Sequence, residues 1–230
     1  EIVVSDPKYN GTKVSDFSTL EGVIICVPTP EEEDGSCDVS YIDAVLKDCA
    51  PDTKVLIKST MSIEGYRRLK AAYPNLSITY SPEFLTAANS VEDFANQKSI
   101  YLAGDCIDLW STVFCTALPD AIIKTATSVE ELILVKYFRN SFLATKVAYA
   151  NQMYDACEKM GISYTKLREK FGEDPRIGYN HTNVPGVDGR GFGGACFPKD
   201  TAALIKTADI YGLDLSIIEA AVNYNNKVKI

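Results

Sequence analysis

The sequence lacks any apolar stretch of membrane-spanning length and any signal-peptide pattern, so we expect a soluble, cytoplasmic protein. It is also poor in basic charge: 23 Lys and Arg stand against 31 Asp and Glu among 230 residues, for a formal net charge of −8. Binding to a phosphate backbone would have to overcome general repulsion, so nucleic acid is not an expected partner. The single histidine, His181, falls in a loop where such a side chain is ordinarily solvated, and we do not expect it in a catalytic site.

The cysteines lack both a pairing pattern and the spacing of metal ligands. Two of them, Cys26 and Cys106, lie in or beside apolar runs. We therefore expect reduced thiols, no disulfide framework and no metal site. The seven positions are Cys26, Cys37, Cys49, Cys106, Cys115, Cys157 and Cys196.

A Gly-x-Gly-x-x-Gly phosphate loop is missing as well, so we expect the first βα unit of a dinucleotide-binding fold to lie outside the given sequence. What is present alternates between β-branched runs and helical stretches. This pattern predicts an α/β fold with a doubly wound, mainly parallel, Rossmann-like sheet, followed by a mostly helical region. Strands are expected at 1–7, 23–27, 54–58, 77–80, 99–103 and 121–124, and helices at 41–49 (capped by Ser40), 63–73, 106–118, 163–171, 201–211 and 215–228.

One long helix is expected to connect the two regions. Ser128 and Glu131 have the spacing of a capping box, and no strong helix breaker follows until Gly161. A helix of about 30 residues spans about 45 Å, more than one compact domain needs. It therefore connects two lobes or builds an oligomer interface. We expect a nucleotide-binding domain at 1–127 and a helical domain at 128–230.

The most informative segment is Gly191-Phe192-Gly193-Gly194-Ala195-Cys196-Phe197-Pro198-Lys199-Asp200. Its glycines let the backbone bend sharply and approach a ligand closely. Pro198 suits the first turn of a helix, which places Cys196 just outside the positive end of the helix dipole. The dipole and Lys199 both favour the thiolate, the form that attacks carbon. Alternatively, Cys196 is a small buried hydrophobe and the glycines only make a tight turn.

This segment resembles the active-site signature of the UDP-glucose/GDP-mannose dehydrogenase family, and the resemblance runs from the first strand to the last helix. It implies an NAD-dependent oxidation of a nucleotide sugar, such as UDP-glucose to UDP-glucuronate, with two NAD per sugar. Cys196 would attack the C6 aldehyde, and the thiohemiacetal would be oxidised to a thioester that water releases. The family's carboxy-terminal UDP-binding domain has no counterpart, so we expect a short form, with a homodimer built through the long helix and helical domain.

The long helix carries a second candidate pair. Lys136 and Asn140 lie on one face among apolar residues. The lysine either snorkels to water or meets a developing oxyanion. The stretch resembles the family helix whose Lys and Asn hold the substrate's reacting oxygen. The resemblance also implies that Asp200 and Thr60 orient water or relay a proton.

A loop after the strand at 77–80 resembles the family's Pro-Glu-Phe-Leu motif, as Pro82-Glu83-Phe84-Leu85. The resemblance implies that Glu83 assists hydrolysis and that the backbone of Phe84 and Leu85 binds substrate. Alternatively, Glu83 is a solvated loop carboxylate. Ala87 stands where family members commonly carry a second glutamate, which removes any role shared between two carboxylates.

Further substrate contacts are implied for an arginine and for the glycine loop. Arg176 resembles a family arginine that reaches the substrate, sometimes from a neighbouring subunit; the alternative is a surface cation. The resemblance adds Gly191, Phe192 and Gly193 to the substrate-binding set.

Two strand ends are the expected NAD site, because doubly wound sheets bind ligands at the carboxyl edge of their strands. Val27-Pro28-Thr29-Pro30 and Lys58-Ser59-Thr60 resemble the family's NAD contacts, and Ser59 and Thr60 are the expected binding residues of the second segment. Asp6, at the end of the predicted first strand, either accepts the ribose hydroxyl or only starts a turn.

A second hypothesis belongs to another class. Ala87, the missing phosphate loop and the missing third domain are also compatible with a non-catalytic protein that binds a nucleotide or nucleotide sugar.

Overall fold

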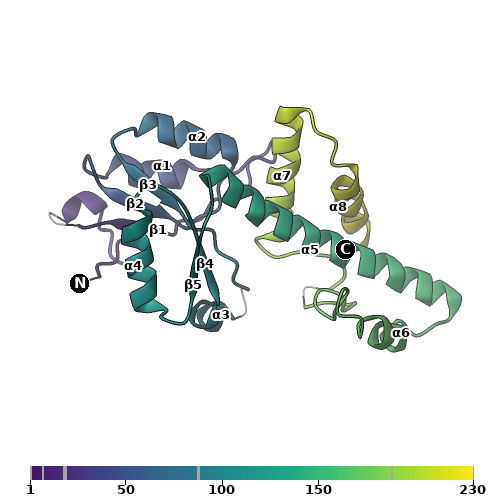
Figure 1. Cartoon of the computed structure of the whole chain (residues 1–230). Helices are drawn as coiled ribbons and strands as arrows, with labels where there is room; N and C mark the ends of the chain where they lie inside the picture. Colours follow the sequence, from purple (N-terminus) through teal and green to yellow (C-terminus); the bar gives the residue numbers. More distant parts are fainter. Residues whose placement is uncertain (1, 7, 18–19, 87–88, 188, 230) are drawn as a thin grey trace. The chain divides into compact units, whose positions relative to one another are not determined.

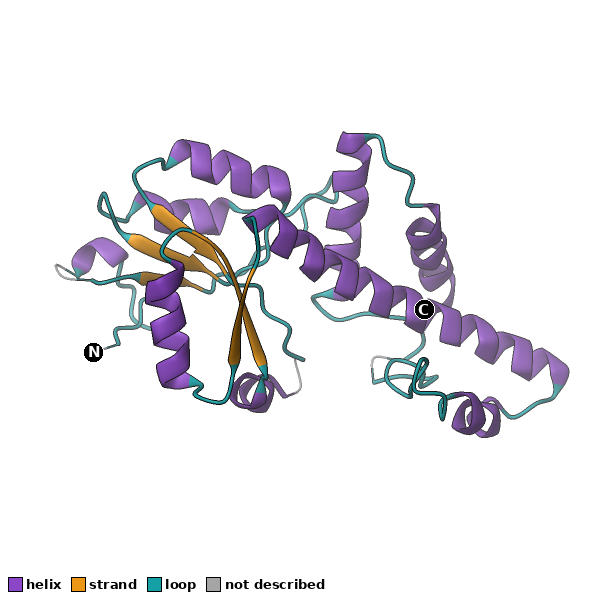
Figure 2. Ribbon diagram, viewed as in Figure 1, coloured by secondary structure: helices purple, strands orange, loops and turns teal. Residues whose placement is uncertain are grey.

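The computed structural model describes residues 2–6, 8–17, 20–86, 89–187 and 189–229. Its sheet has the strand order β1-β2-β3-β4-β5, and neighbouring strands are parallel except β3 and β4 (Figures 1 and 2). The mainly parallel α/β fold predicted from the sequence is confirmed. The strands are β1 (Val23–Ile25), β2 (Lys54–Ile57), β3 (Ser77–Tyr80), β4 (Ser99–Gly104) and β5 (Ile122–Thr125).

The central strands are buried on both faces, as expected of parallel strands covered by helices. Val55, Leu56 and Ile57 of β2 are fully buried in succession. Trp110 and Phe114 pack against Leu56 in one apolar cluster. Figure 1 shows two helices together beside one face of the sheet and another against the other face. The first two are α1 (Ser40–Lys47) and α2 (Ile63–Ala72), and the other is α4 (Ile107–Ala117).

Helix starts follow local capping chemistry, with one exception to the predictions. Ser62 caps α2, where its hydroxyl accepts a hydrogen bond from the Gly65 N–H at 2.9 Å. The predicted cap at Ser40 is wrong, because Ser40 is the first residue of α1 and its own N–H donates to the Asp38 carboxylate at 2.7 Å. A carboxylate placed there stabilises the helix N-terminus. Two short elements were not predicted, the 3-10 helix η1 (Val14–Asp16) and α3 (Ser90–Asn96).

The long helix is confirmed as α5 (Val129–Met160). The Ser128 hydroxyl accepts from the Glu131 N–H at 3.1 Å, and the Glu131 carboxylate accepts from the N–H of Thr127 at 2.8 Å. In the predicted capping box the Glu131 carboxylate would accept the N–H of Ser128; instead it accepts the N–H of Thr127, one residue earlier. The chain divides within α5 into a first unit, residues 1–32 and 37–136, and a second unit, residues 33–36 and 137–230.

The second unit is helical. Alanines of α5 and α8 pack with Phe192 in its core. The short segment 33–36 is tied to α7 by the ion pair between Asp34 and Lys206, at 3.0 Å. The predicted helix at 201–211 begins earlier than expected, with Cys196 as its N-cap. Besides α5, the helices are α6 (Tyr164–Phe171), α7 (Phe197–Tyr211) and α8 (Ser216–Val228).

The strand predicted at the amino end is wrong, since the described residues 2–6 form no strand. The Asp6 carbonyl accepts the Asn10 N–H at 2.9 Å, and the Asp6 carboxylate accepts the Lys8 N–H at 2.8 Å. Asp6 thus starts a turn, and its contact with the ribose hydroxyl stays a prediction. Pro7 lies outside the described residues.

Two other expectations concern the whole chain. All seven cysteines are free thiols. Among the described residues, no helix is both long and apolar enough to cross a membrane.

Candidate functional site

The first unit carries a group of charged and aromatic side chains at the carboxyl ends of its strands, here called the sheet-edge cluster: Cys26, Lys58, Glu83, Phe84 and Lys136. The Lys58 ammonium follows β2 and lies 3.1 Å from the Glu83 carboxylate, which follows β3. Because β2 and β3 are parallel, their ends meet at one edge. Glu83 is thus a paired carboxylate rather than the solvated loop glutamate of the alternative.

Lys58 was not among the predicted site residues. Its ammonium also donates to the Ser81 carbonyl at 3.3 Å and lies 5.4 Å from the centre of the Phe114 ring. The sequence signal for it is a lysine directly after a buried apolar strand, where a charge needs a partner. Lys58 also influences a neighbouring thiol: burial raises the pKa of Cys26, and the Lys58 charge partly opposes that rise.

Lys136 completes the sheet-edge cluster from the first turns of α5. Its side chain is 7% exposed, so it does not snorkel to water. The ammonium donates to the Glu83 carbonyl and lies 5.6 Å from the centre of the Phe84 ring. Phe84 also packs edge-on against Tyr101 at 5.8 Å. A buried ammonium held against the Glu83 loop can stabilise negative charge that develops beside it.

The two predicted NAD-binding loops follow β1 and β2 and are tied to each other. The Ser59 hydroxyl donates to the Val27 carbonyl at 2.7 Å, so it holds the loops together. The buried Cys37 thiol donates to the Thr60 carbonyl at 3.4 Å. Thr60 is half-buried, Thr29 is buried, and Pro28 and Pro30 are exposed. These hydroxyl and peptide groups at a carboxyl edge fit the polar groups of a nicotinamide dinucleotide.

The second unit carries the cysteine loop, residues Gly191–Asp200. Cys196 is exposed and occupies the N-cap position of α7, with Pro198 in the first turn. The alternative of a buried structural cysteine is therefore wrong. The α7 N-terminus directs its unpaired N–H groups and its positive dipole end toward this position. The arrangement suits an accessible sulfur nucleophile.

Asp200, the last residue of the cysteine loop, is the centre of a polar group formed with Asn140 and Lys199. Its side chain is 1% exposed, and its two oxygens have different partners. One accepts from the Asn140 amide of α5 at 2.6 Å, and the other lies 2.7 Å from the Lys199 ammonium. The structure thus brings the predicted residues Asn140 and Asp200 together, and it pairs Lys199 with Asp200.

Other predicted residues have simpler surroundings. Arg176 is exposed and forms a bidentate pair with Asp174, at 2.5 Å for the closest atoms, which is the geometry of a surface cation. Phe192 differs from its prediction as a substrate contact: its ring is buried in the apolar core, and its N–H and C=O are both bonded to Asn225. Gly193 and Leu85 are partly exposed, and Ala87 lies outside the described residues.

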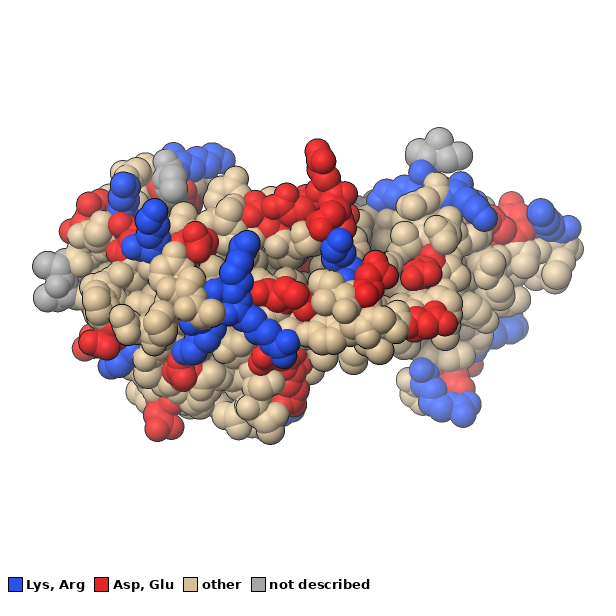
Figure 3. Space-filling view, turned by 90° about the horizontal axis from the view of Figure 1, so that it is seen from above, with Lys and Arg blue, Asp and Glu red and all other residues tan. Residues whose placement is uncertain are grey.

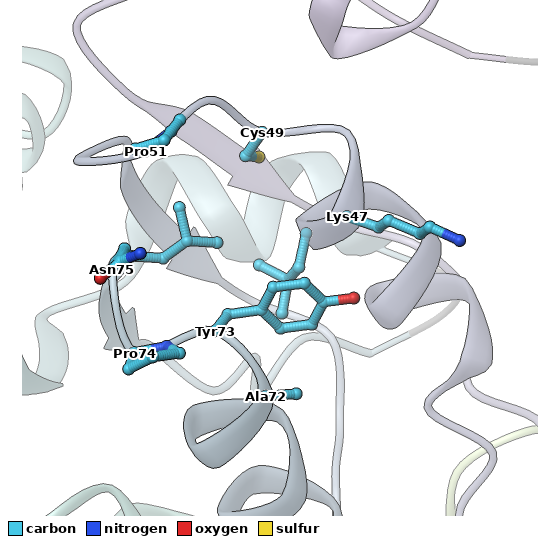
Figure 4. A pocket seen from close by; sticks show the side chains of 9 residues that line it. Lys47, Cys49, Pro51, Ala72, Tyr73, Pro74 and Asn75 are labelled. Atoms are coloured by element: carbon cyan, nitrogen blue, oxygen red, sulfur yellow. The ribbon is translucent and has the colours of Figure 1, made fainter.

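A cavity of about 180 Å³ lies elsewhere in the first unit, at the amino ends of β2 and β3 (Figure 4). The Tyr73 hydroxyl in it donates to the Asp43 carboxylate at 3.1 Å, and the Cys49 thiol donates to the Val45 carbonyl at 3.3 Å. Burial raises the pKa of the Cys49 thiol to about 11. The cavity is at the opposite edge from the predicted NAD loops and has no group poised for chemistry.

The charged groups of the described residues do not form a metal site. Within these ranges no three His, Cys, Asp or Glu side chains are arranged to hold an ion. Figure 3 shows Lys and Arg side chains interleaved with Asp and Glu on the face in view.

Comparison with known proteins connects both units to one family. Residues 4–106 match the NAD binding domain of the UDP-glucose/GDP-mannose dehydrogenase family, and residues 130–227 match the central domain of the same family. The first match contains the tied strand-end loops and indicates NAD as the cofactor. The second contains Lys136, Asn140 and the cysteine loop.

Individual relatives show the same correspondence. The UDP-glucose 6-dehydrogenase of Rickettsia typhi is 34% identical over 231 residues, which cover 95% of this chain and 52% of that protein. A UDP-glucose dehydrogenase structure from Pyrobaculum islandicum matches with a TM-score of 0.77 and 30% identity, over 90% of this chain and 50% of its own. A UDP-D-ManNAc dehydrogenase structure from Pyrococcus horikoshii shares the fold, with a TM-score of 0.78 and 22% identity over 94% and 52% of the two chains. The chain spans about half the length of these relatives.

Proposed function

The chain belongs to the UDP-glucose/GDP-mannose dehydrogenase family, and from that premise we propose that it takes part in oxidising UDP-glucose to UDP-glucuronate with NAD. The observation that carries the proposal is the position of Cys196. It is an exposed sulfur at the N-cap of α7, presented by a glycine loop whose last residue, Asp200, is a buried carboxylate. Neither a buried cysteine nor a plain turn would have this combination.

Cys196 would act on the aldehyde formed when the C6 alcohol loses a hydride and a proton. The thiolate adds to the aldehyde carbon, so that a C–S bond forms and the carbonyl oxygen takes the electron pair. Loss of a second hydride from the thiohemiacetal leaves a thioester. Water then breaks the C–S bond and releases the carboxylate. When bound, each NAD accepts one hydride, so two NAD are consumed per sugar.

The other residues would stabilise the oxyanion, transfer protons and assist hydrolysis. Asn140 is held by Asp200 with its amide nitrogen as donor, and we propose that it stabilises the oxyanion together with Lys136. Asp200 would relay a proton or orient water with Thr60. Glu83 would assist hydrolysis, and its carboxylate is held in place by the ion pair with Lys58.

The NAD contacts are proposed for the tied loops of the first unit. Val27, Pro28, Thr29 and Pro30 would contribute backbone groups, and Thr60 a hydroxyl. Ser59 would act by fixing the loop, because its hydroxyl is bonded to Val27.

We also propose a homodimer through α5. Phe138, Phe142 and Tyr149 are large, exposed and on this helix. Exposed aromatic residues at helical spacing are a common basis for protein contacts. Sedimentation should give twice the chain mass, and Phe142→Asp should reduce it to the mass of one chain.

The test of the main proposal is NADH formation from UDP-glucose, followed by absorbance. Cys196→Ala should abolish turnover, and the matched control Cys115→Ala, another exposed thiol, should leave it unchanged. Normal NADH formation by Cys196→Ala would contradict the mechanism. Calorimetric binding of UDP-glucose without NADH formation by the unmodified chain would instead support the non-catalytic binding protein.

A further inference from the structure

We infer that Asn225 and Asn151, two buried asparagines outside the cysteine loop, are positioning residues that fix the backbone leading to Cys196. The inference rests on the proposed function, because it assigns these residues to the placement of the proposed nucleophile. The pair comes from two different helices, α8 and α5.

Asn225 pairs with one residue of the loop through both of its side-chain groups. Its carbonyl oxygen accepts the Phe192 N–H at 2.6 Å, and its amide donates to the Phe192 carbonyl at 3.1 Å. The Lys229 ammonium donates to the same carbonyl at 3.0 Å. Asn225 is 4% exposed, so water would not replace these bonds easily. The peptide groups of Phe192 are therefore held in one orientation.

Asn151 holds the preceding residue. Its side-chain oxygen accepts the Gly191 N–H at 3.1 Å and the Arg190 guanidinium at 3.3 Å. Arg190 is itself held by the Asp155 carboxylate at 2.7 Å. The side chain of Asn151 is 1% exposed, and its amide donates to the Val147 carbonyl of α5 at 3.0 Å. Consecutive backbone groups of the loop are thus bonded to buried side chains of two helices.

The glycine at the start of the loop is adapted to this contact. Gly191 has a φ of +75°, and a Cβ at that position would lie 2.4 Å from the side-chain oxygen of Asn225. Glycine is therefore required both for the backbone conformation and for the approach of the asparagine.

The hold on Phe192 extends to Cys196 through the core. Phe192 is buried in an apolar cluster with Ala144, Ala148 and Ala221, and Phe197 packs against the same cluster. Only residues 193–196 lie between the two phenylalanines. Because both ends of this short span rest on one core, fixing the Phe192 backbone limits where the sulfur can lie.

The experiment compares Asn225→Ala and Asn151→Ala with Asn226→Ala, an exposed asparagine next along α8. Hydrogen exchange of peptides covering 190–196 should rise at least tenfold in Asn225→Ala and in Asn151→Ala, and it should stay unchanged in the control. A misplacement of about 1 Å costs on the order of 100-fold in rate. We therefore expect kcat to fall at least tenfold while KM for NAD stays within twofold.

Three results would overturn the inference: unchanged exchange in the loop, unchanged kcat despite raised exchange, or an equal effect of Asn226→Ala. Exchange of the α7 core amides shows whether a variant is folded. If Asn225→Ala does not fold, Asn151→Ala, which removes fewer bonds to the loop, decides the question.

Failure of the proposed function is recognised separately, by absence of NADH formation in the unmodified chain. In that case site-resolved alkylation by iodoacetamide replaces kcat as the readout. The Cys196 rate relative to Cys115 should fall at least fivefold in Asn225→Ala, because the released sulfur leaves the α7 N-terminus. An unchanged ratio would overturn the inference.

Discussion

The two units hold their candidate groups in different ways. In the sheet-edge cluster, Lys58 and Glu83 stand at the ends of parallel strands, and their charges neutralise each other in a partly exposed position. In the cysteine loop, the proposed nucleophile follows irregular backbone that buried asparagines hold, and the carboxylate of Asp200 is 1% exposed. Strand ends are positioned by the sheet itself, whereas a loop needs polar partners from other elements. Substitutions in the second unit should therefore cost more than matching ones in the first.

The largest effect is expected at Asp200. Asp200→Asn would place an amide donor against the donor group of Asn140 or Lys199 and leave the Lys199 ammonium without a negatively charged partner. Breaking a buried ion pair costs about 4 kcal/mol. The free energy of unfolding of the second unit, measured with denaturant, should fall by about that amount. Asp209→Asn, exposed on the same helix, should change it by less than about 0.5 kcal/mol.

The next effect separates backbone strain from the asparagine contact. Gly191→Ala adds a Cβ that meets Asn225 at 2.4 Å, on a backbone with a φ of +75°. We expect the free energy of unfolding to fall by about 3 kcal/mol, of which about 1 kcal/mol is strain from the positive φ. Gly189→Ala is the matched control, with a φ of +85° and nothing within 4 Å of its Cβ, and should lose only the strain.

A double-mutant cycle tests the source of that difference. In the Asn225→Ala background the clashing oxygen is gone, so Gly191→Ala should cost no more than Gly189→Ala. Equal costs of Gly191→Ala in both backgrounds would show that the contact with Asn225 is not the reason for glycine there.

The corresponding change in the first unit should be smaller. Lys58→Met keeps the packing against Phe114 and leaves Glu83, whose side chain is 26% exposed, free to be hydrated. We expect the free energy of unfolding of the first unit to fall by about 1 kcal/mol. Loss of the positive charge should also raise the pKa of Cys26 further, so alkylation of Cys26 at pH 8.5 should slow. Lys54→Met, at the exposed start of β2, should do neither. A loss as large as that of Asp200→Asn would remove the contrast between the units.

Much of the fold was predictable because it depends on local pattern. The β-branched run of β2 and the long helix are both found where the sequence placed them. The strand expected at 1–7 failed because β propensity is not enough without a neighbouring strand to pair with. The cap of α1 failed for a related reason: Asp38 and Ser40 are both good capping residues, but the backbone makes Val39 the N-cap and leaves Asp38 to accept the Ser40 N–H.

The site residues also differ in whether local sequence or long-range contacts determine their positions. Cys196 at the helix N-cap was predictable from Pro198 and the glycines, which act over a few residues. Asn151 and Asn225 were not, because a polar residue in a helix gives no sign of being buried against a loop 33 to 40 residues away. The pairing of Lys58 with Glu83 likewise depends on which strands are neighbours.

The smallest expected effect is on the pH dependence of the free energy of unfolding, and it compares Tyr224 of the second unit with Tyr73 of the first. Burial, together with the hydrogen bond to Asp155, raises the pKa of Tyr224 to about 12, and burial with Asp43 raises the pKa of Tyr73. A raised pKa means that the folded state holds the proton more tightly, so this stabilisation is complete below pH 10 and is lost as the pH rises from 10 toward 12. Tyr224→Phe should therefore flatten the decline in stability of the second unit over that range, and Tyr73→Phe should flatten only that of the first.

The same titration should loosen the cysteine loop, because Asp155 also holds Arg190. In the unmodified chain, hydrogen exchange of the 190–196 peptides, corrected for the intrinsic exchange rate, should rise over this pH range more than in Tyr224→Phe. If instead both profiles coincide, Tyr224 has no part in holding the cysteine loop.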